Sequence, residues 1–211
     1  MPQPNPDGIR AGRVIAILRD REGRRLREIS DALIDSGIRA LELTTNTPGA
    51  AEVVAEIASA GRAHVGMGTV RTTDHVRLAA DAGASFIVTP AVSLEVGELA
   101  LGLGLAWYPG AVTPTEIESA WAGGATAVKI FPAAALGGPR YISELRGPLD
   151  DIPLIPTGGV RIQDIREYLH GGSYAVGIGS PLIGSAFVDG DLAALRSRAR
   201  DVVAAVGAEH R

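Results

Sequence analysis

Short apolar segments alternate with longer amphipathic segments along the whole chain. The apolar segments are rich in β-branched residues and are bounded by glycine or polar residues, which predicts β-strands. Because they are almost continuously apolar, we expect burial on both faces, as in a parallel sheet. The eight predicted strands span residues 14–18, 40–44, 64–68, 86–89, 106–108, 127–131, 154–157 and 175–179.

The segments between these strands have helical features. Leu26, Ile29, Leu33 and Ile34 have the spacing of one buried helix face. Residues 113–116, Thr-Pro-Thr-Glu, provide an N-cap, a first-turn proline and a capping-box acid in succession. Strands and helices therefore alternate through the chain.

Eight strand–helix units in 211 residues predict an α/β protein with a compact (β/α)8 TIM barrel. A doubly wound open sheet has the same alternation and is the competing architecture. No linker or change of composition divides the chain, so we expect a single domain over residues 1–211. Within it, we expect residues 1–12 to form a loose N-terminal arm.

Composition and charge narrow the function classes. The chain is 46% hydrophobic and 21% charged, as is ordinary for a soluble protein, and its net charge of -4 argues against nucleic-acid binding. It has no cysteine, which excludes disulfides and thiol chemistry, and no apolar run of the roughly 18 residues that a membrane span needs. We expect a cytoplasmic protein. Its four histidines lack metal-ligand spacing, so we predict no metal and no cofactor.

One residue stands out among the basic side chains. Lys129 is the single lysine among 20 basic residues, and it lies in the middle of an apolar predicted strand. A buried ammonium is unfavourable unless it is paired or loses its proton, and a neutral amine in a dry pocket can form an imine with a ketone. Arginine cannot replace it in that role. The alternative is an ion-paired lysine in the barrel interior, or one whose ammonium reaches the rim.

An acid lies in a similar position in the second predicted strand. Glu42 is flanked by apolar residues, and a carboxylate near a neutral Lys129 could move protons during imine chemistry. Alternatively, it forms a salt bridge with Lys129 or with an arginine. Both interpretations can hold, since an acid that pairs with the lysine at rest can act as the base during turnover.

Glycine-rich segments follow the last two strands. Gly158 and Gly159 come after the seventh strand, and Gly179 and Ser180 after the eighth. In phosphate-binding barrels the loops at these two positions hold the phosphate, whereas glycines also serve turn geometry alone. The pair of loops predicts a phosphate site.

Three further residues at strand ends are candidates for binding a carboxylate. Thr69 and Pro90 follow the third and fourth strands, where hydroxyl or backbone donors could face a ligand or simply form turns. Arg19 follows the first strand and is either an anion contact or a surface residue.

Together these motifs resemble the family of 2-keto-3-deoxy-6-phosphogluconate aldolase and its relatives. The resemblance rests on Glu42-Leu-Thr, residues 68–70 (Gly-Thr-Val), Thr89-Pro90, residues 129–133 (Lys-Ile-Phe-Pro-Ala) and residues 157–160 (Thr-Gly-Gly-Val), and it extends from about residue 14 to residue 205. It implies a homotrimeric barrel enzyme that cleaves a 2-keto-3-deoxy sugar acid, usually phosphorylated, into pyruvate and an aldehyde. The segment 129–133 is its most specific part.

The resemblance also implies a role for each matched residue. Lys129 would form the Schiff base and Glu42 would be the general acid and base. The other implied roles are pyruvate contacts for Thr69 and Pro90, a substrate-hydroxyl contact for Thr157, and phosphate contacts for Gly158, Gly159, Gly179 and Ser180.

The chain departs from the phosphogluconate enzymes at one position. Asn46 stands where they carry an arginine for the pyruvate carboxylate, and Asn followed by a small residue and proline is similar to the 2-keto-3-deoxy-6-phosphogalactonate aldolases. Those enzymes carry an arginine after the first strand, matched here by Arg19. Thr157, in contrast, is the residue type of the phosphogluconate enzymes. The substrate stereochemistry is therefore open, and Arg19 is the better candidate to bind the carboxylate, with Asn46 as a further substrate contact.

Two rival functions share the glycine loops. A phosphosugar isomerase or epimerase barrel would need no amine and should survive borohydride treatment with substrate. A non-catalytic trimer that binds a sugar phosphate would use Lys129 only as an ion-pair partner and would release no pyruvate.

Overall fold

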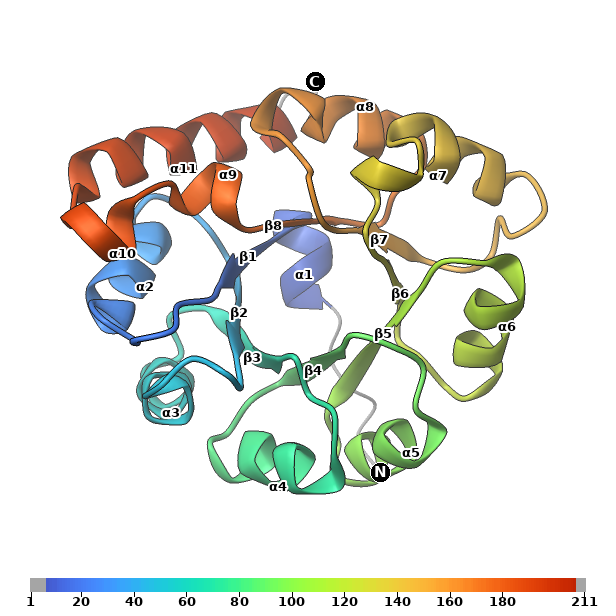
Figure 1. Cartoon of the computed structure of the whole chain (residues 1–211), viewed down its shortest axis with the longest axis horizontal. Coiled ribbons are helices and arrows are strands. Elements are labelled where there is room, and N and C mark those ends of the chain that lie inside the picture. The colour runs from blue at the N-terminus through green and yellow to red at the C-terminus, as the bar shows by residue number, and fades with distance from the viewer. Residues whose placement is uncertain (1–6, 208–211) are drawn as a thin grey trace.

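The computed structural model describes residues 7–207, which form a barrel of eight parallel strands surrounded by helices (Figure 1). The strands follow one another in the order β7-β6-β5-β4-β3-β2-β1-β8. Their bounds are β1 Val14–Leu18, β2 Ala40–Thr44, β3 His64–Gly68, β4 Phe86–Thr89, β5 Ala106–Ala111, β6 Val128–Ile130, β7 Leu154–Pro156 and β8 Val176–Ile178.

The last two strands meet and close the barrel. Tyr174 N–H donates to the Leu154 carbonyl at 2.8 Å, and a parallel bridge joins Thr157 to Gly177. The open doubly wound sheet is therefore excluded, and the predicted (β/α)8 barrel is confirmed.

Helices cover the outer face of the strands on all sides (Figure 1). They are α2 Leu26–Asp35, α3 Ala50–Ala60, α4 Thr73–Asp81, α5 Leu94–Gly102, α6 Pro114–Ala122, α7 Pro139–Arg146, α8 Ile165–His170, α9 Ser180–Ile183, α10 Ala186–Asp189 and α11 Leu192–Gly207, with 3-10 turns at Ala134–Leu136 and Ile162–Asp164. The predicted capping box is present at the start of α6, between Thr113 and Glu116. Among the described residues, no helix has the length and apolar character needed to cross a membrane.

The core has two parts because successive strand residues face opposite sides. Outward strand residues pack against the helices in one large cluster. Inward residues at the amino-terminal ends of the strands form a second cluster that includes Phe86, Tyr108 and Ile155. This inner cluster occupies the interior at the amino-terminal end of the barrel.

A short helix, α1 Asp7–Gly12, lies across the amino-terminal end of the barrel (Figure 1). Its Ile9 is fully buried and belongs to the inner cluster. Within the arm that was expected over residues 1–12, residues 7–12 thus form a helix with one large apolar side chain in the barrel interior. Residues 1–6 lie outside the described part of the chain.

Candidate active site

A pocket of about 840 Å³ opens at the carboxyl-terminal ends of the strands. Barrel enzymes hold their active sites at this end, because the loops after all eight strands meet there. Ten of the eleven residues predicted to bind substrate or to act chemically line it: Arg19, Asn46, Thr69, Pro90, Lys129, Thr157, Gly158, Gly159, Gly179 and Ser180. The eleventh, Glu42, is buried and pairs with Lys129.

Lys129 and Glu42 form the chemical centre of this pocket. Lys129 lies in the middle of β6 with a side chain only 9% exposed, and its Nζ is 4.0 Å from Oε1 of Glu42 in the middle of β2. This separation is at the limit for an ion pair and is too long for a hydrogen bond. Oε1 of Glu42 is buried and has no hydrogen-bond partner within residues 7–207. An amine and a carboxylate thus lie together in a site with little solvent, as proton-coupled attack on a carbonyl requires.

The space for the Glu42 carboxylate depends on a glycine in the neighbouring strand. Gly68 ends β3 beside β2, where it is the register partner of Thr44. A Cβ atom at Gly68 would overlap the Glu42 carboxyl group. The absence of a side chain at this inward position therefore lets the carboxylate extend toward Lys129.

An aromatic ring lies above the amine. The Phe131 ring centroid is 5.3 Å from Lys129 Nζ, within the range of a cation–π contact, and the ring lines the pocket. In the sequence, Phe131 is noticeable only as part of the motif at residues 129–133. Its position two residues after Lys129 puts both side chains on the inward face, and this alternation was the available signal.

Arg19 reaches the pocket from the end of β1. Its guanidinium Nη2 donates to Oγ1 of Thr69 at 3.2 Å. Thr69 has φ +58°, a left-handed conformation that is uncommon for a residue with a branched side chain. Both residues line the pocket, so a cation and a hydroxyl face the same region of it.

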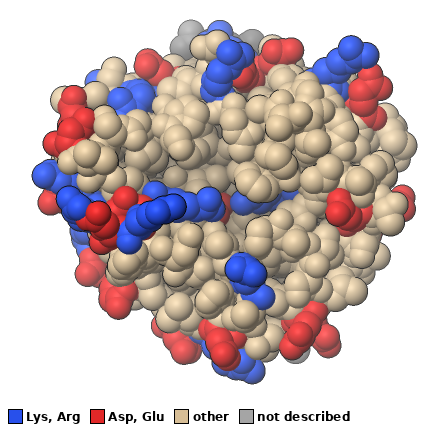
Figure 2. Space-filling model, viewed as in Figure 1, with Lys and Arg blue, Asp and Glu red and all other residues tan. Residues whose placement is uncertain are grey.

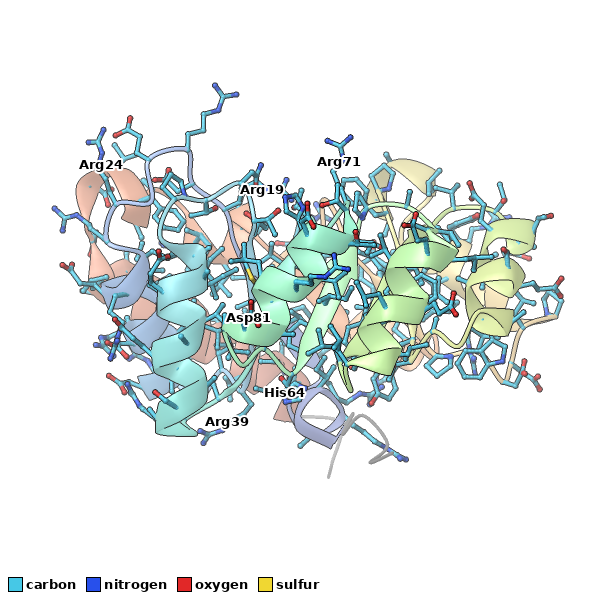
Figure 3. The ribbon with its side chains drawn as sticks, turned by 90° about the horizontal axis from the view of Figure 1, so that it is seen from below. Arg19, Arg24, Arg39, His64, Arg71 and Asp81 are labelled. Carbon is cyan, nitrogen blue, oxygen red and sulfur yellow. The ribbon has the colours of Figure 1, made fainter. Side chains whose placement is uncertain are left out.

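A second arginine borders the same side of the pocket. Arg71, three residues beyond the end of β3, lines the pocket, and its side chain is exposed. Figure 3 shows Arg19 and Arg71 at one edge of the molecule and Arg39 and His64 at the opposite edge. Figure 2 looks directly onto the Arg19 end of the barrel, and basic side chains there extend from the rim toward the centre. Sequence reasoning missed Arg71 because it lies in a loop, outside every motif.

The two glycine loops lie together on the opposite wall of the pocket from Thr69. Gly158 and Gly159 have φ values of +88° and +75°, which favour glycine, and they follow β7. Gly179 precedes α9, and Ser180 is the first residue of that helix. All four line the pocket, together with residues 181, 183, 184 and 187, which the sequence analysis did not single out. Backbone-rich loops beside a helix start can bind an anion closely.

The remaining predicted contacts border the pocket between these groups. Asn46 and Pro90 are exposed at its mouth, after β2 and β4. Thr157 is 5% exposed, and its Oγ1 donates weakly to the Ile155 carbonyl at 3.3 Å. Its hydroxyl can therefore turn to a ligand at small cost. No group of three or more His, Cys, Asp or Glu side chains that could hold a metal ion occurs between residues 7 and 207.

Comparisons with known proteins give the family of this chain. The family model for KDPG and KHG aldolase matches residues 7–197. The 2-dehydro-3-deoxy-phosphogluconate aldolase of Treponema pallidum is 39% identical over 67% of this chain and 68% of its own length. The 2-dehydro-3-deoxy-6-phosphogalactonate aldolase of Escherichia coli is 37% identical over 72% and 75%.

A solved structure extends the comparison to the chemistry. The KDPG aldolase of Legionella pneumophila, described with pyruvate captured as a covalent carbinolamine intermediate, superimposes with a TM-score of 0.82. It is 26% identical, and the match covers 94% of this chain and 98% of that one.

Proposed function

This chain belongs to the KDPG and KHG aldolase family, and from that premise we propose that it is a class I aldolase whose imine forms on Lys129. Its substrate is a 2-keto-3-deoxy-6-phospho sugar acid, cleaved reversibly to pyruvate and glyceraldehyde 3-phosphate. The observation that carries the proposal is the buried Lys129 amine 4.0 Å from the Glu42 carboxylate, on the floor of the pocket. An isomerase or epimerase would need no such amine.

The reaction begins at the ketone of the substrate. Lys129 Nζ attacks C2, and Glu42 transfers protons as the carbinolamine forms and then loses water. The product is a protonated imine on Lys129. The aromatic face of Phe131, 5.3 Å from Nζ, favours positive charge at this point.

Cleavage uses the imine as an electron sink. A base removes the proton of the C4 hydroxyl, the C3–C4 bond breaks, and its electron pair moves into the iminium to give an enamine. The C4 hydroxyl becomes the carbonyl of the released aldehyde. Protonation of the enamine at C3 and hydrolysis of the imine release pyruvate and restore the Lys129 amine. Glu42 is the group positioned to move these protons.

Groups at opposite sides of the pocket orient the substrate. Arg19 and Thr69 bind the carboxylate, to which the guanidinium can present two N–H donors. The phosphate is bound by Gly158, Gly159, Gly179 and Ser180. Binding this group, far from the reacting carbons, helps to hold those carbons in place.

The residues between the two anion sites contact the hydroxyls that distinguish the sugar acids. Thr157 and Asn46 are the candidates, and Pro90 borders the pyruvate end. Thr157 is the residue type found at this position in the gluconate enzymes, whereas Asn46 and Arg19 are the residue types found in the galactonate enzymes. Both epimers are therefore candidate substrates. Pyruvate release from the two phosphorylated acids, measured side by side, gives the preferred stereochemistry as a ratio of kcat/KM.

We also propose that the enzyme is a cytoplasmic homotrimer. Apolar side chains are exposed on adjacent outer helices, including Leu94 (54%) and Trp121 (36%), and a subunit contact would bury such groups. A phosphorylated sugar acid carries charges that do not cross a membrane, which favours an intracellular enzyme. Light scattering coupled to gel filtration tests the trimer.

Borohydride trapping tests the central proposal. The protein is incubated with pyruvate and sodium borohydride, and intact and peptide masses are measured. One reduced pyruvate adduct on the peptide that contains Lys129 is expected. A protein that remains unlabelled, under conditions that label an established imine aldolase, contradicts the assignment.

A further inference from the structure

Three threonines at the end of β2 hydrogen-bond to groups next to Arg19: the backbone on each side of it, and Thr69, to which its side chain donates. Thr44 and Thr47 are almost fully buried, with exposures of 0% and 3%, whereas Thr45 is half-buried. The hydroxyl of each one hydrogen-bonds to a backbone group at or just after the end of a neighbouring strand. None of them lines the pocket, so a direct contact with substrate does not account for them.

Two of these hydroxyls fix the backbone on both sides of Arg19. Thr44 Oγ1 donates to the Leu18 carbonyl at 3.4 Å, and Thr47 Oγ1 accepts from the Asp20 N–H at 3.1 Å. The two hydroxyls also hydrogen-bond to each other at 2.9 Å. The side chain of Arg19 is exposed, but the backbone on each side of it is fixed by the buried Thr44–Thr47 pair.

The third hydroxyl acts on the side-chain partner of Arg19. Thr45 Oγ1 donates to the Thr69 carbonyl at 2.9 Å. Thr69 is the residue in the left-handed conformation at φ +58°, which costs energy for a β-branched residue and persists only where its surroundings hold it. In that conformation its Oγ1 accepts from Arg19 Nη2 at 3.2 Å.

We propose that Thr45 is a positioning residue for carboxylate binding, acting through the strained Thr69 to fix the guanidinium of Arg19. The chain of contacts is Thr45 hydroxyl, Thr69 carbonyl, Thr69 hydroxyl, Arg19 guanidinium. The inference rests on the proposed function, in which Arg19 binds the carboxylate of the 2-keto acid. Without the Thr45 hydrogen bond, Thr69 can relax to an unstrained conformation, and Arg19 then samples other rotamers. Affinity for the carboxylate should fall, while the Lys129 chemistry remains.

The test is Thr45→Val, which keeps the side-chain shape and removes the hydroxyl. The pyruvate concentration for half-maximal borohydride labelling of the Lys129 peptide should rise about two- to tenfold, the range for one net hydrogen bond. The value of kcat for cleavage should change less than twofold. Thr45→Ser retains the hydroxyl and should restore the labelling curve of the original protein.

Two controls separate positioning from a general structural effect. Thr73→Val removes a half-buried hydroxyl at the first residue of α4, for which no side-chain hydrogen bond is seen within residues 7–207, and should leave the labelling curve unchanged. In an Arg19→Met background, Thr45→Val should cause a clearly smaller shift, because the guanidinium through which it mainly acts is gone and only the Thr69 contact with the carboxylate remains. Thr45→Ala, which introduces no new atoms, is a second variant should the valine protein fail to fold.

The outcomes distinguish the inference from the proposed function. An unlabelled original protein overturns both. Normal labelling of the original protein with an unchanged curve in Thr45→Val, or an equal shift in the Arg19→Met background, overturns the role of Thr45 and leaves the aldolase assignment intact.

Discussion

Lys129 Nζ and Glu42 Oε1 lie 4.0 Å apart in the barrel interior, although the two residues belong to strands on different sides of the barrel. Each has little contact with solvent, so each depends on the other, or on a substrate, to compensate for the water it has lost. The distance leaves Glu42 without a hydrogen bond from the amine, and the carboxylate is therefore available to exchange protons with a bound ligand. The predictions on catalysis follow from this pair.

Replacing Lys129 by arginine should abolish turnover and labelling, because a guanidinium keeps its charge and cannot form the imine. Pyruvate release should fall to the background of the assay, with the circular dichroism spectrum of a folded barrel. The matched control is Arg140→Lys, which adds an exposed amine on α7. That variant should keep its activity, and its only adduct should be on the Lys129 peptide. Substantial aldolase activity in Lys129→Arg would exclude the proposed nucleophile.

Glu42→Gln should lower kcat by about 10²- to 10⁴-fold, the usual contribution of a general acid or base. The amide keeps the shape of the side chain but cannot carry a proton between steps. Labelling of Lys129 with pyruvate should still reach completion but more slowly, as followed by quenching with borohydride at increasing times. A normal kcat would show that the acid only pairs with the lysine at rest.

Gly68→Ala should have an effect similar to that of Glu42→Gln, because the added methyl group overlaps the Glu42 carboxyl group and forces it away from Lys129. The same substitution at Gly102, the last residue of α5, meets no atom within 4 Å and should leave activity unchanged. Both proteins are compared by kcat and by thermal midpoint. Equal kcat values for the two variants would show that the carboxylate has no required position.

Much of this fold could be predicted from periodicity alone. The strands β1 to β4 begin and end at the predicted residues, since each is a short apolar run bounded by polar residues or glycine. The fifth strand continues three residues beyond its predicted end, to Ala111, through Pro109 and Gly110. Local propensity argues against both residues in a strand, but pairing with β4 and β6 extends it.

The candidate site was predictable to the extent that its residues lie on strands or belong to motifs that directly follow strands. Alternation placed Lys129 and Glu42 inside the barrel, and the order of the strands placed the glycine loops together. Arg71 and Thr45 were not predicted, because their roles depend on how loops fold over the strand ends. The strained conformation of Thr69 likewise has no local sequence signal.

Ser180→Ala should weaken binding of the phosphorylated substrate without affecting imine formation with pyruvate. Ser180 begins α9 beside Gly179 at the proposed phosphate end of the pocket, and the loss of one hydroxyl donor should raise KM about two- to tenfold. The pyruvate labelling curve should not change, because pyruvate lacks the phosphate. A shift in both measurements, or in pyruvate labelling alone, would show that Ser180 does not act on the phosphate alone.

The amino-terminal end of the barrel should make stability depend on pH through His64. This side chain stacks on the Phe86 ring with centroids 5.3 Å apart, and its Nδ1 lies 3.2 Å from Ser85 Oγ. Burial lowers the pKa of His64 below its ordinary value of 6.5. In the unfolded chain the same imidazole takes up its proton near pH 6.5, so below that pH the unfolded state binds more protons than the folded state.

The free energy of unfolding should therefore fall as the pH decreases from about 7.5 through 6.5, until it passes the lowered pKa of folded His64. His64→Phe keeps an aromatic ring against Phe86 and removes the titrating group, so it should reduce this loss. Urea unfolding of both proteins at pH 7.5 and 5.5 measures the two differences. If the proteins lose the same stability between these values, the imidazole is protonated in the folded barrel at no cost, and the pH dependence belongs to other groups.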